Sequence, residues 1–192
     1  MFDYIEGKLI NIEPNYAVLD TGGWGIKCVI SMFTYNKIKS ELGKKTKLYI
    51  HMVLKDDAAE LIGFHDTVER QAYVLLNRVS GIGSKVAISI LSLMNVSQLK
   101  ASILCEDVKT LVTIPGIGKK TAQKMIIELK DRIKELPVED KVIGSAVLEA
   151  REVLVSLGFK PGEIQLVLKD DFIGENDTVE DIVKIALKKL SK

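Results

Sequence analysis

The chain has 192 residues, of which 47% are hydrophobic and 28% charged, and its formal net charge is +1. This balance is typical of a soluble globular protein and excludes a disordered tail protein. Two cysteines, two histidines and no long apolar run exclude a disulfide framework, a zinc finger and a membrane span. The N-terminus lacks the pattern of a signal peptide, so we expect a cytoplasmic protein.

The first 63 residues contain short apolar or alternating runs that predict β-strands. These runs are Tyr16–Asp20, Gly25–Ser31 and Thr46–Leu54. Residues Phe33 to Leu42 have the spacing of a helix that ends before Gly43. Gly7, within the opening run, predicts a bend or bulge. About five short strands in this length favour a small closed barrel, because closure removes the exposed sheet edges.

From His65 to about Leu136 the hydrophobic period becomes helical. One helical face carries Val68, Ala72, Leu75, Leu76 and Val79. Residues 64–135 hold 11 Lys/Arg against 7 Asp/Glu, whereas residues 136–192 hold 8 against 11. A basic middle third indicates that an anion-binding function lies there.

The last third begins with a segment rich in Pro, Gly and charge, residues 137–144, which predicts a flexible linker. Residues 145–192 predict three short helices. The first would end at Gly158 with Phe159 packing back, and a capping box at residues 177–180 would open the third. We expect Leu154, Leu157 and Phe159 to form the core of this part.

An internal repeat carries the strongest functional signal in the sequence. Residues 76–87, LNRVSGIGSKVA, align with residues 111–122, LVTIPGIGKKTA, at an offset of 35 residues. The Leu, Gly, Ile, Gly, Lys and Ala positions coincide, and each copy lies between two predicted helices. Two matched copies resemble the helix-hairpin-helix motif of DNA-binding proteins, whereas a single GxG would be a weak signal.

Each glycine pair permits a tight turn with positive φ and brings the main chain close to a ligand. The following helix starts there, so its unpaired N–H groups and positive dipole end form an anion site. Amides that contact phosphate read no base, so we expect sequence-independent DNA binding. The predicted contacts are Gly81, Ile82, Gly83, Ser84 and Lys85, and Gly116, Ile117, Gly118, Lys119 and Lys120. The alternative is that the glycines only cap two helix corners.

The second copy is not a nucleotide-binding P-loop. That motif requires Ser or Thr where Lys120 stands and Gly where Thr113 stands. We therefore expect no ATPase site and no cofactor.

The whole chain resembles the RuvA family of bacterial Holliday-junction-binding proteins. The resemblance rests on residues 1–8, MFDYIEGK, on residues 53–64, VLKDDAAELIGF, and on both hairpins. It is extended by ELKDR at residues 128–132 and by the Leu-Gly-Phe turn at residues 157–159.

The resemblance implies a multi-domain α+β protein with three domains. These would be an OB-like oligomerisation barrel at residues 1–64, a tandem helix-hairpin-helix domain at 65–136 and, after the 137–144 linker, a UBA-like three-helix bundle at 145–192. It implies a non-catalytic homotetramer, one or two per junction, that holds four-way junction DNA open during recombination and repair. The implied partners are the ATP-using motor RuvB, which Leu154, Leu157 and Phe159 could contact, and the resolvase RuvC.

Asp56 and Asp57 have two interpretations. From the residues alone they are solvated turn residues, because Asp favours tight turns. The resemblance instead implies an acidic pin, whose carboxylates would repel phosphates at the junction centre. Trp24, His51 and His65 receive no functional assignment.

Two other functions remain open from the sequence. The chain could be a junction nuclease in which Asp56, Asp57 and Glu60 hold a metal ion. It could also be a general duplex-DNA scaffold with no preference for junctions.

Overall fold

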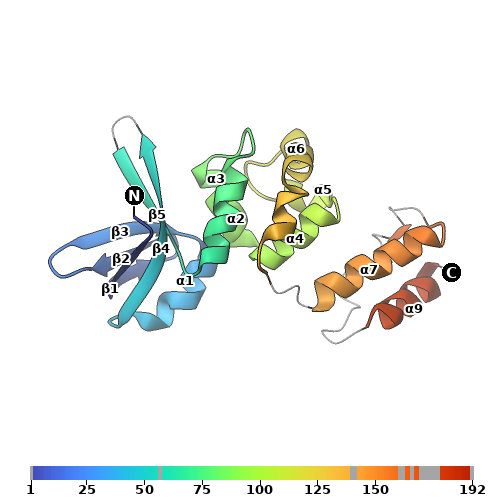
Figure 1. Ribbon diagram of the computed structural model, residues 1–192, viewed down its shortest axis with the longest axis horizontal. Coiled ribbons are helices and arrows are strands. Elements are labelled where there is room, and N and C mark those ends of the chain that lie inside the picture. Colours follow the sequence, from blue (N-terminus) through green and yellow to red (C-terminus); the bar gives the residue numbers. More distant parts are fainter. Residues whose placement is uncertain are drawn as a thin grey trace. The chain divides into compact units, whose positions relative to one another are not determined.

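The structure is a computed structural model that describes residues 2–55, 58–138, 142–159, 163–164, 167–168 and 178–190 (Figure 1). Residues Met1–Val138 form one compact unit and residues Glu139–Lys192 form another. The first unit contains a barrel followed by helices, and both parts share one hydrophobic cluster that includes Ile62 and Phe64 from the last strand.

Five strands close the predicted barrel, in the order β1-β2-β3-β5-β4. The strands are β1 (Tyr4–Glu13), β2 (Tyr16–Asp20), β3 (Gly25–Ile30), β4 (Lys45–Lys55) and β5 (Ala58–Phe64). Alternate residues point inward, as the period of two requires, and they fill the barrel with aliphatic side chains. Burial raises the pKa of the Cys28 thiol to about 12, so this cysteine is a packing residue.

The helix expected over Phe33 to Leu42 is shorter than predicted. Helix α1 (Met32–Ile38) continues only as a 3₁₀ turn, η1 (Lys39–Glu41). Ser31, expected at a strand end, is instead the N-cap of α1, because its hydroxyl accepts the Thr34 N–H. Gly43 follows with φ +82°, a conformation that favours glycine.

The bulge in β1 lies between Leu9 and Asn11 and not at Gly7, so a bulge at Gly7 was a wrong prediction. Gly7 pairs regularly with Thr46, and the register shifts between Leu9 and Asn11. Gly7 is needed for another reason: a Cβ there would lie 2.4 Å from the Asp20 carbonyl oxygen. The close approach of β2 therefore demands a residue without a side chain.

We expect Gly7→Ala to lower the free energy of unfolding by about 2 kcal/mol, because the Asp20 main chain must move. Gly25→Ala is the matched control, since its Cβ would meet only Val18 Cγ1, at 3.7 Å. Urea unfolding of both variants checks the prediction. Equal midpoints for the two variants would contradict it.

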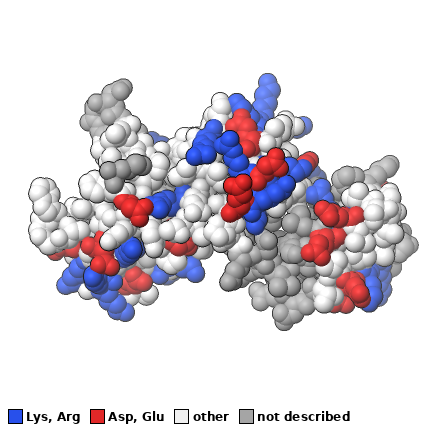
Figure 2. Space-filling view, viewed as in Figure 1, with Lys and Arg blue, Asp and Glu red and all other residues white. Residues whose placement is uncertain are grey.

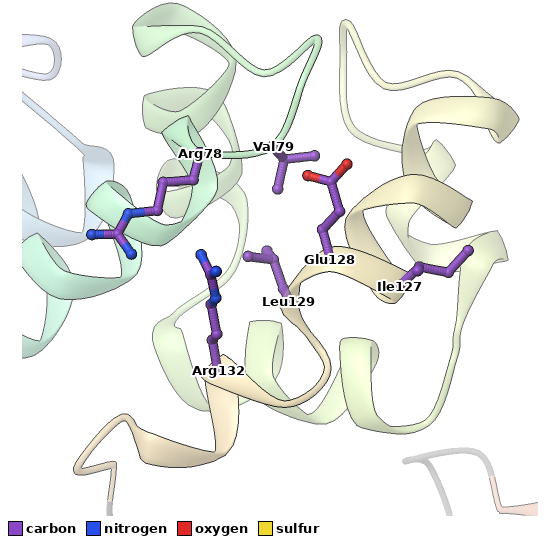
Figure 3. Close-up of a pocket in the computed structure, with 6 residues that line it drawn as sticks. All are labelled: Arg78, Val79, Ile127, Glu128, Leu129 and Arg132. Atoms are coloured by element: carbon purple, nitrogen blue, oxygen red, sulfur yellow. The ribbon is translucent and has the colours of Figure 1, made fainter.

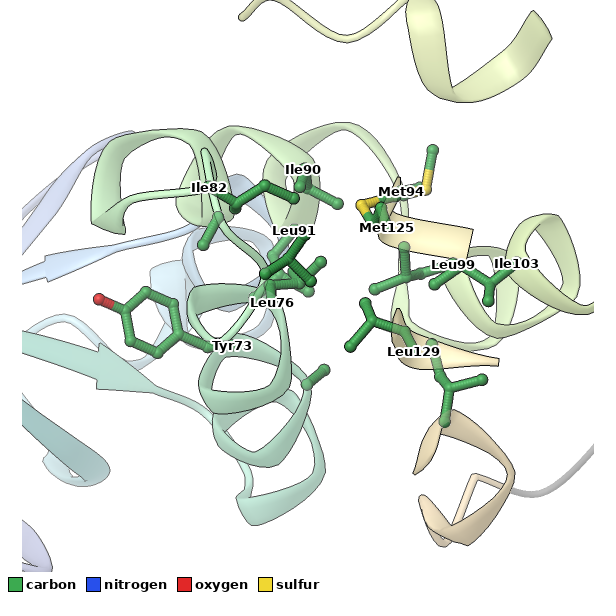
Figure 4. Close-up of a cluster of buried hydrophobic side chains, with 14 of the residues drawn as sticks. Tyr73, Leu76, Ile82, Ile90, Leu91, Met94, Leu99, Ile103, Met125 and Leu129 are labelled. Carbon is green, nitrogen blue, oxygen red and sulfur yellow. The ribbon is translucent and has the colours of Figure 1, made fainter. Parts of the chain in front are cut away.

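Within the described residues of the first unit, six helical segments follow the barrel. They are α2 (Thr67–Asn77), α3 (Ser84–Leu93), α4 (Val96–Leu104), α5 (Val108–Val112), α6 (Lys119–Leu129) and the 3₁₀ turn η2 (Arg132–Glu135). The predicted apolar face of α2 is confirmed, since Ala72, Leu76 and Val79 are buried and Val68 and Leu75 pack against the same cluster. Figure 4 shows side chains from these helices meeting in that cluster.

No single helix in the described parts of the chain is long and apolar enough to cross a membrane. Helices α3 and α4 pass that test only together, and they are bent by 99° with respect to each other. Both contribute buried residues to the core, among them Ile90, Leu91 and Leu99.

The second unit contains α7 (Val142–Ser156) and α9 (Val179–Leu190). The predicted turn after α7 is confirmed: Gly158 has φ +93°, and the Phe159 N–H donates to the Leu154 carbonyl. The cap of α9 differs from the prediction. Thr178 Oγ1 accepts the Asp181 N–H and the Asp181 carboxylate accepts the Thr178 N–H, whereas Asp177 lies outside the described residues.

The core predicted for this unit is partly confirmed. Leu154 is fully buried and Phe159 packs against the same cluster. Leu157, however, is 56% exposed, so its assignment to the core was wrong. Val153 and Leu157 lie one helical turn apart, and Val153 is also exposed.

Candidate nucleic-acid interface

The two copies of the sequence repeat fold into the same hydrogen-bonded turn. In the first, the Ile82 N–H donates to the Val79 carbonyl and the Ala87 N–H to Gly83. In the second, the Ile117 N–H donates to Ile114 and the Ala122 N–H to Gly118. The donors and acceptors match at the offset of 35 residues, so the repeat is structural as well as sequential.

The glycines of each turn have different roles. Gly81 and Gly116 have φ +94° and +89°, the left-handed conformation that the turn requires. Gly83 and Gly118 have φ −95° and −88°, which any residue can adopt, so the predicted positive φ is confirmed at the first glycine of each pair. A Cβ on Gly83 or Gly118 would meet nothing within 4 Å. These two glycines therefore keep the main chain accessible from outside.

The isoleucines between the glycines anchor the turns. Ile82 and Ile117 are 3% and 4% exposed and belong to the hydrophobic cluster of the helices. Figure 4 shows Ile82 among the side chains of that cluster. These residues, predicted as DNA contacts, can contribute only through their main-chain atoms.

The helices that follow the two turns start without a side-chain cap. Gly83 is the N-cap of α3 and Gly118 is the N-cap of α6, and neither has a side chain that could accept a hydrogen bond from the N–H groups of the first helical turn. By contrast, α1, α2, α4 and α5 each have an N-cap residue whose side chain accepts a hydrogen bond from a main-chain N–H of the first turn. These residues are Ser31, Asp66, Asn95 and Asp107. Uncapped N–H groups at the positive end of a helix form a site for an anion such as phosphate.

Basic side chains lie close to these helix starts. Lys85, Lys119 and Lys120 are exposed, and Ser84 is half-buried. Figure 2 shows Lys and Arg gathered over the helical part of the first unit, with acidic side chains among them. Lysines at this place add attraction for phosphate without any base preference.

The second turn packs against α3, the helix that follows the first turn. A Cβ on Gly116 would lie 3.3 Å from Val86 Cγ2, in the first turn of α3. Glycine is therefore favoured at position 116 for two reasons: the positive φ of its own turn, and the close approach of the second hairpin to α3. This packing sets the spacing between the two turns.

A pocket next to the first turn brings an arginine of the repeat, Arg78, to the same place as one outside it, Arg132 (Figure 3). Arg78 and Arg132 line it, together with Val79, Ile127, Glu128 and Leu129. In Figure 3 the Arg132 side chain extends toward Arg78, although the two residues come from α2's C-cap and from η2. Only the tertiary fold brings these two arginines together, which is why the sequence did not single them out.

The acidic pair Asp56–Asp57 lies outside the described residues. Its flanks are described: β4 and β5 are paired up to Lys55 and Ala58, so the pair connects the two ends of a hairpin. In Figure 1 this end of the hairpin and the turns before α3 and α6 lie on the same, upper side of the unit. Within the described residues, no group of three or more His, Cys, Asp or Glu side chains is placed to hold a metal ion.

Comparisons with known proteins agree with this geometry. Residues 1–63 match the RuvA N-terminal domain, and residues 73–131 match the SAM-like helix-hairpin-helix tandem. Proteins named "Holliday junction branch migration complex subunit RuvA" are similar over the full length. The one from Clostridium beijerinckii is 37% identical, with 99% of each chain covered, and those from Streptococcus thermophilus and Clostridium botulinum strain Loch Maree are 36% and 38% identical, with 100% covered. The chain therefore belongs to the RuvA family.

Proposed function

We propose that this protein binds four-way junction DNA by its shape, without sequence preference, as the non-catalytic subunit of a branch migration complex. One observation carries the proposal: the protein holds two identical turns, each opening an uncapped helix, at a fixed spacing. Two phosphate sites held in this way suit the two backbones of one duplex arm. The full-length relatives support the choice of a junction, since their name states it.

The number of arms argues for a tetramer. One pair of hairpins holds one arm, and a four-way junction has four equivalent arms. Head-to-tail contacts between barrels that close after four copies would present one hairpin pair to each arm. Four subunits also sum their phosphate contacts, which makes up for the net charge of +1 per chain. The Asp56–Asp57 pair of each subunit would then face the centre and repel the phosphates of the crossing strands.

We assign residues 1–64, 65–136 and 145–192 to oligomerisation, DNA binding and motor binding. Residues 136–192 carry more acidic than basic side chains, which disfavours DNA and favours a protein partner. The exposed Val153, Val155 and Leu157 give this unit apolar side chains for such a contact. The partner would be the RuvB motor, which supplies the ATPase, and RuvC would act on the same junction in the cytoplasm.

A competition binding assay tests the proposal. A labelled four-way junction is bound at fixed salt and then displaced by unlabelled junction or by linear duplex of the same arm sequence. We expect the junction to compete at a concentration at least about tenfold lower than the duplex. Equal competition would favour a general duplex scaffold, and cleavage of the junction in Mg²⁺ would favour a nuclease.

We expect a chain that ends at Val138 to keep its junction affinity within about twofold, because the hairpins belong wholly to the first unit. The same truncation should abolish stimulation of the partner ATPase. Gel shifts and ATP hydrolysis in the presence of the motor measure the two properties separately. Stimulation that persists would place the motor contact in the first unit.

A further inference from the structure

Two neighbouring residues in the first turn of α2 join this helix to the barrel by polar contacts. Glu69 is 1% exposed, and its carboxylate oxygens accept hydrogen bonds from Ser31 Oγ and Thr34 Oγ1, at the start of α1. The partners are 38 and 35 residues away in the sequence. The contact therefore belongs to the tertiary structure and not to α2 itself.

The hydroxyl groups in this cluster have fixed directions. Ser31 Oγ accepts the Thr34 N–H at 3.0 Å, and Thr34 Oγ1 accepts the His65 N–H at 2.9 Å. Since their lone pairs are used by main-chain donors, each hydroxyl directs its proton to Glu69. Burial raises the pKa of Glu69, and the two hydroxyl donors oppose that rise. Hydrogen bonds have a preferred direction, so the two that the buried Glu69 carboxyl accepts favour one arrangement of α2 relative to α1.

Arg70 makes the second connection, to Asp3 ahead of β1. Its Nη1 donates to Asp3 Oδ1 at 2.6 Å and to the Asp3 carbonyl at 2.8 Å, and its guanidinium lies 5.5 Å from the centre of the Tyr49 ring. A third contact joins α1 to α3, where the Met32 N–H donates to Ser92 Oγ at 3.0 Å. We name Glu69, Arg70 and their hydrogen-bond partners the seam.

Apolar packing alone would fix the angle of α2 less sharply. The rings of Phe64 and Tyr73 lie 5.1 Å apart and those of His51 and Tyr73 lie 5.2 Å apart across the same boundary. These contacts hold the barrel and α2 together, but the hydrophobic effect has no preferred direction. The seam adds hydrogen bonds to this packing, and their geometry is strongly directional.

A small change of angle at the seam becomes large at the hairpins. Helix α2 has 11 residues, so it is about 16 Å long. A tilt of about 10° at its first turn would displace its far end, where the first hairpin begins, by about 3 Å. A hydrogen bond to phosphate does not survive such a displacement, since its donor–acceptor distance tolerates only a few tenths of an ångström.

We propose that Glu69, assisted by Arg70, is a positioning residue that fixes the hairpins relative to the barrel and so gives the protein its preference for four-way junctions over linear duplex. The inference rests on the proposed function. A linear duplex needs only one correctly built hairpin pair. A junction needs hairpin pairs from several subunits at set angles around a shared centre. A change in the orientation of the hairpins should therefore lower the affinity for the junction and leave the affinity for linear duplex nearly unchanged.

The test compares Glu69→Gln with wild type in the full-length chain. Glutamine has the same shape, but its nitrogen only donates, so one hydroxyl loses its acceptor. We expect junction affinity to fall about tenfold while duplex affinity changes less than about twofold. Glu13→Gln, at an exposed position of β1, is the matched control and should change neither affinity. The selectivity ratio is the informative readout, because a purely structural role would change thermal stability without changing this ratio.

An unchanged ratio, or an equal loss of both affinities, would overturn the proposal. If Glu69→Gln does not fold, Thr34→Val removes one hydroxyl from the seam and Arg70→Gln removes the contact with Asp3, and the same ratio decides. Failure of the proposed function would be distinct, because wild type itself would then show no preference for the junction.

Discussion

Replacing Gly118 by Val is expected to weaken junction binding about 100-fold while leaving the fold unchanged. The φ of −88° at this position suits valine, and its Cβ would meet nothing within 4 Å, so the turn should form. The side chain would nevertheless stand in front of the uncapped N–H groups of α6 and exclude a phosphate from them. Titration of labelled junction DNA measures the affinity, and circular dichroism with thermal unfolding checks the fold.

Two variants make this result specific. Gly83→Val changes the equivalent position of the first hairpin, which is equally open, and should weaken binding to a similar degree. Gly25→Val adds the same side chain to an exposed strand of the barrel and should leave the affinity unchanged. Normal affinity in both hairpin variants would refute the assignment of the turns as phosphate sites.

Replacing Lys85, Lys119 and Lys120 together by Gln should also weaken binding about 100-fold near physiological salt, and it should reduce the dependence of binding on salt. Each phosphate contact contributes about 0.9 to the slope of log K against log salt, because it releases condensed counterions. The three exposed lysines beside the uncapped helices should therefore account for a measurable part of that slope. Binding isotherms between about 50 and 200 mM salt give both quantities.

The control removes the same charge elsewhere. Lys8, Lys37 and Lys44 are exposed on the N-terminal part of the chain, with Lys37 in α1, and their joint replacement by Gln changes net charge equally. A local effect at the hairpins predicts that this control keeps most of the affinity and the slope. If both triple variants lose the same affinity, the attraction comes from overall charge and not from the hairpins.

The sequence predicts the parts of this molecule that depend on local pattern. The strand alternation of the barrel and the apolar face of α2 follow from periods of two and 3.6 residues. The 35-residue repeat predicts both turns, because identical Gly-Ile-Gly segments between helices meet the same steric demands.

Features that depend on distant segments could not be predicted from local pattern. The need for glycine at position 7 comes from the Asp20 carbonyl, which the barrel brings close to it. The pairing of Glu69 with Ser31 joins residues 38 positions apart. Leu157 has the spacing of a core residue, yet the packing of its helix leaves it exposed. The positions and roles of Asp56 and Asp57 stay predictions.

The phosphate contacts proposed at the uncapped starts of α3 and α6 would have a mechanical consequence for moving DNA. Main-chain donors meet the same chemical group at every step along a strand, so no stretch of the double helix is held more strongly than the next. DNA that slides past these donors would cross only small energy barriers, spaced at the phosphate repeat. A motor that pulls the arms would therefore meet nearly the same resistance at every base sequence.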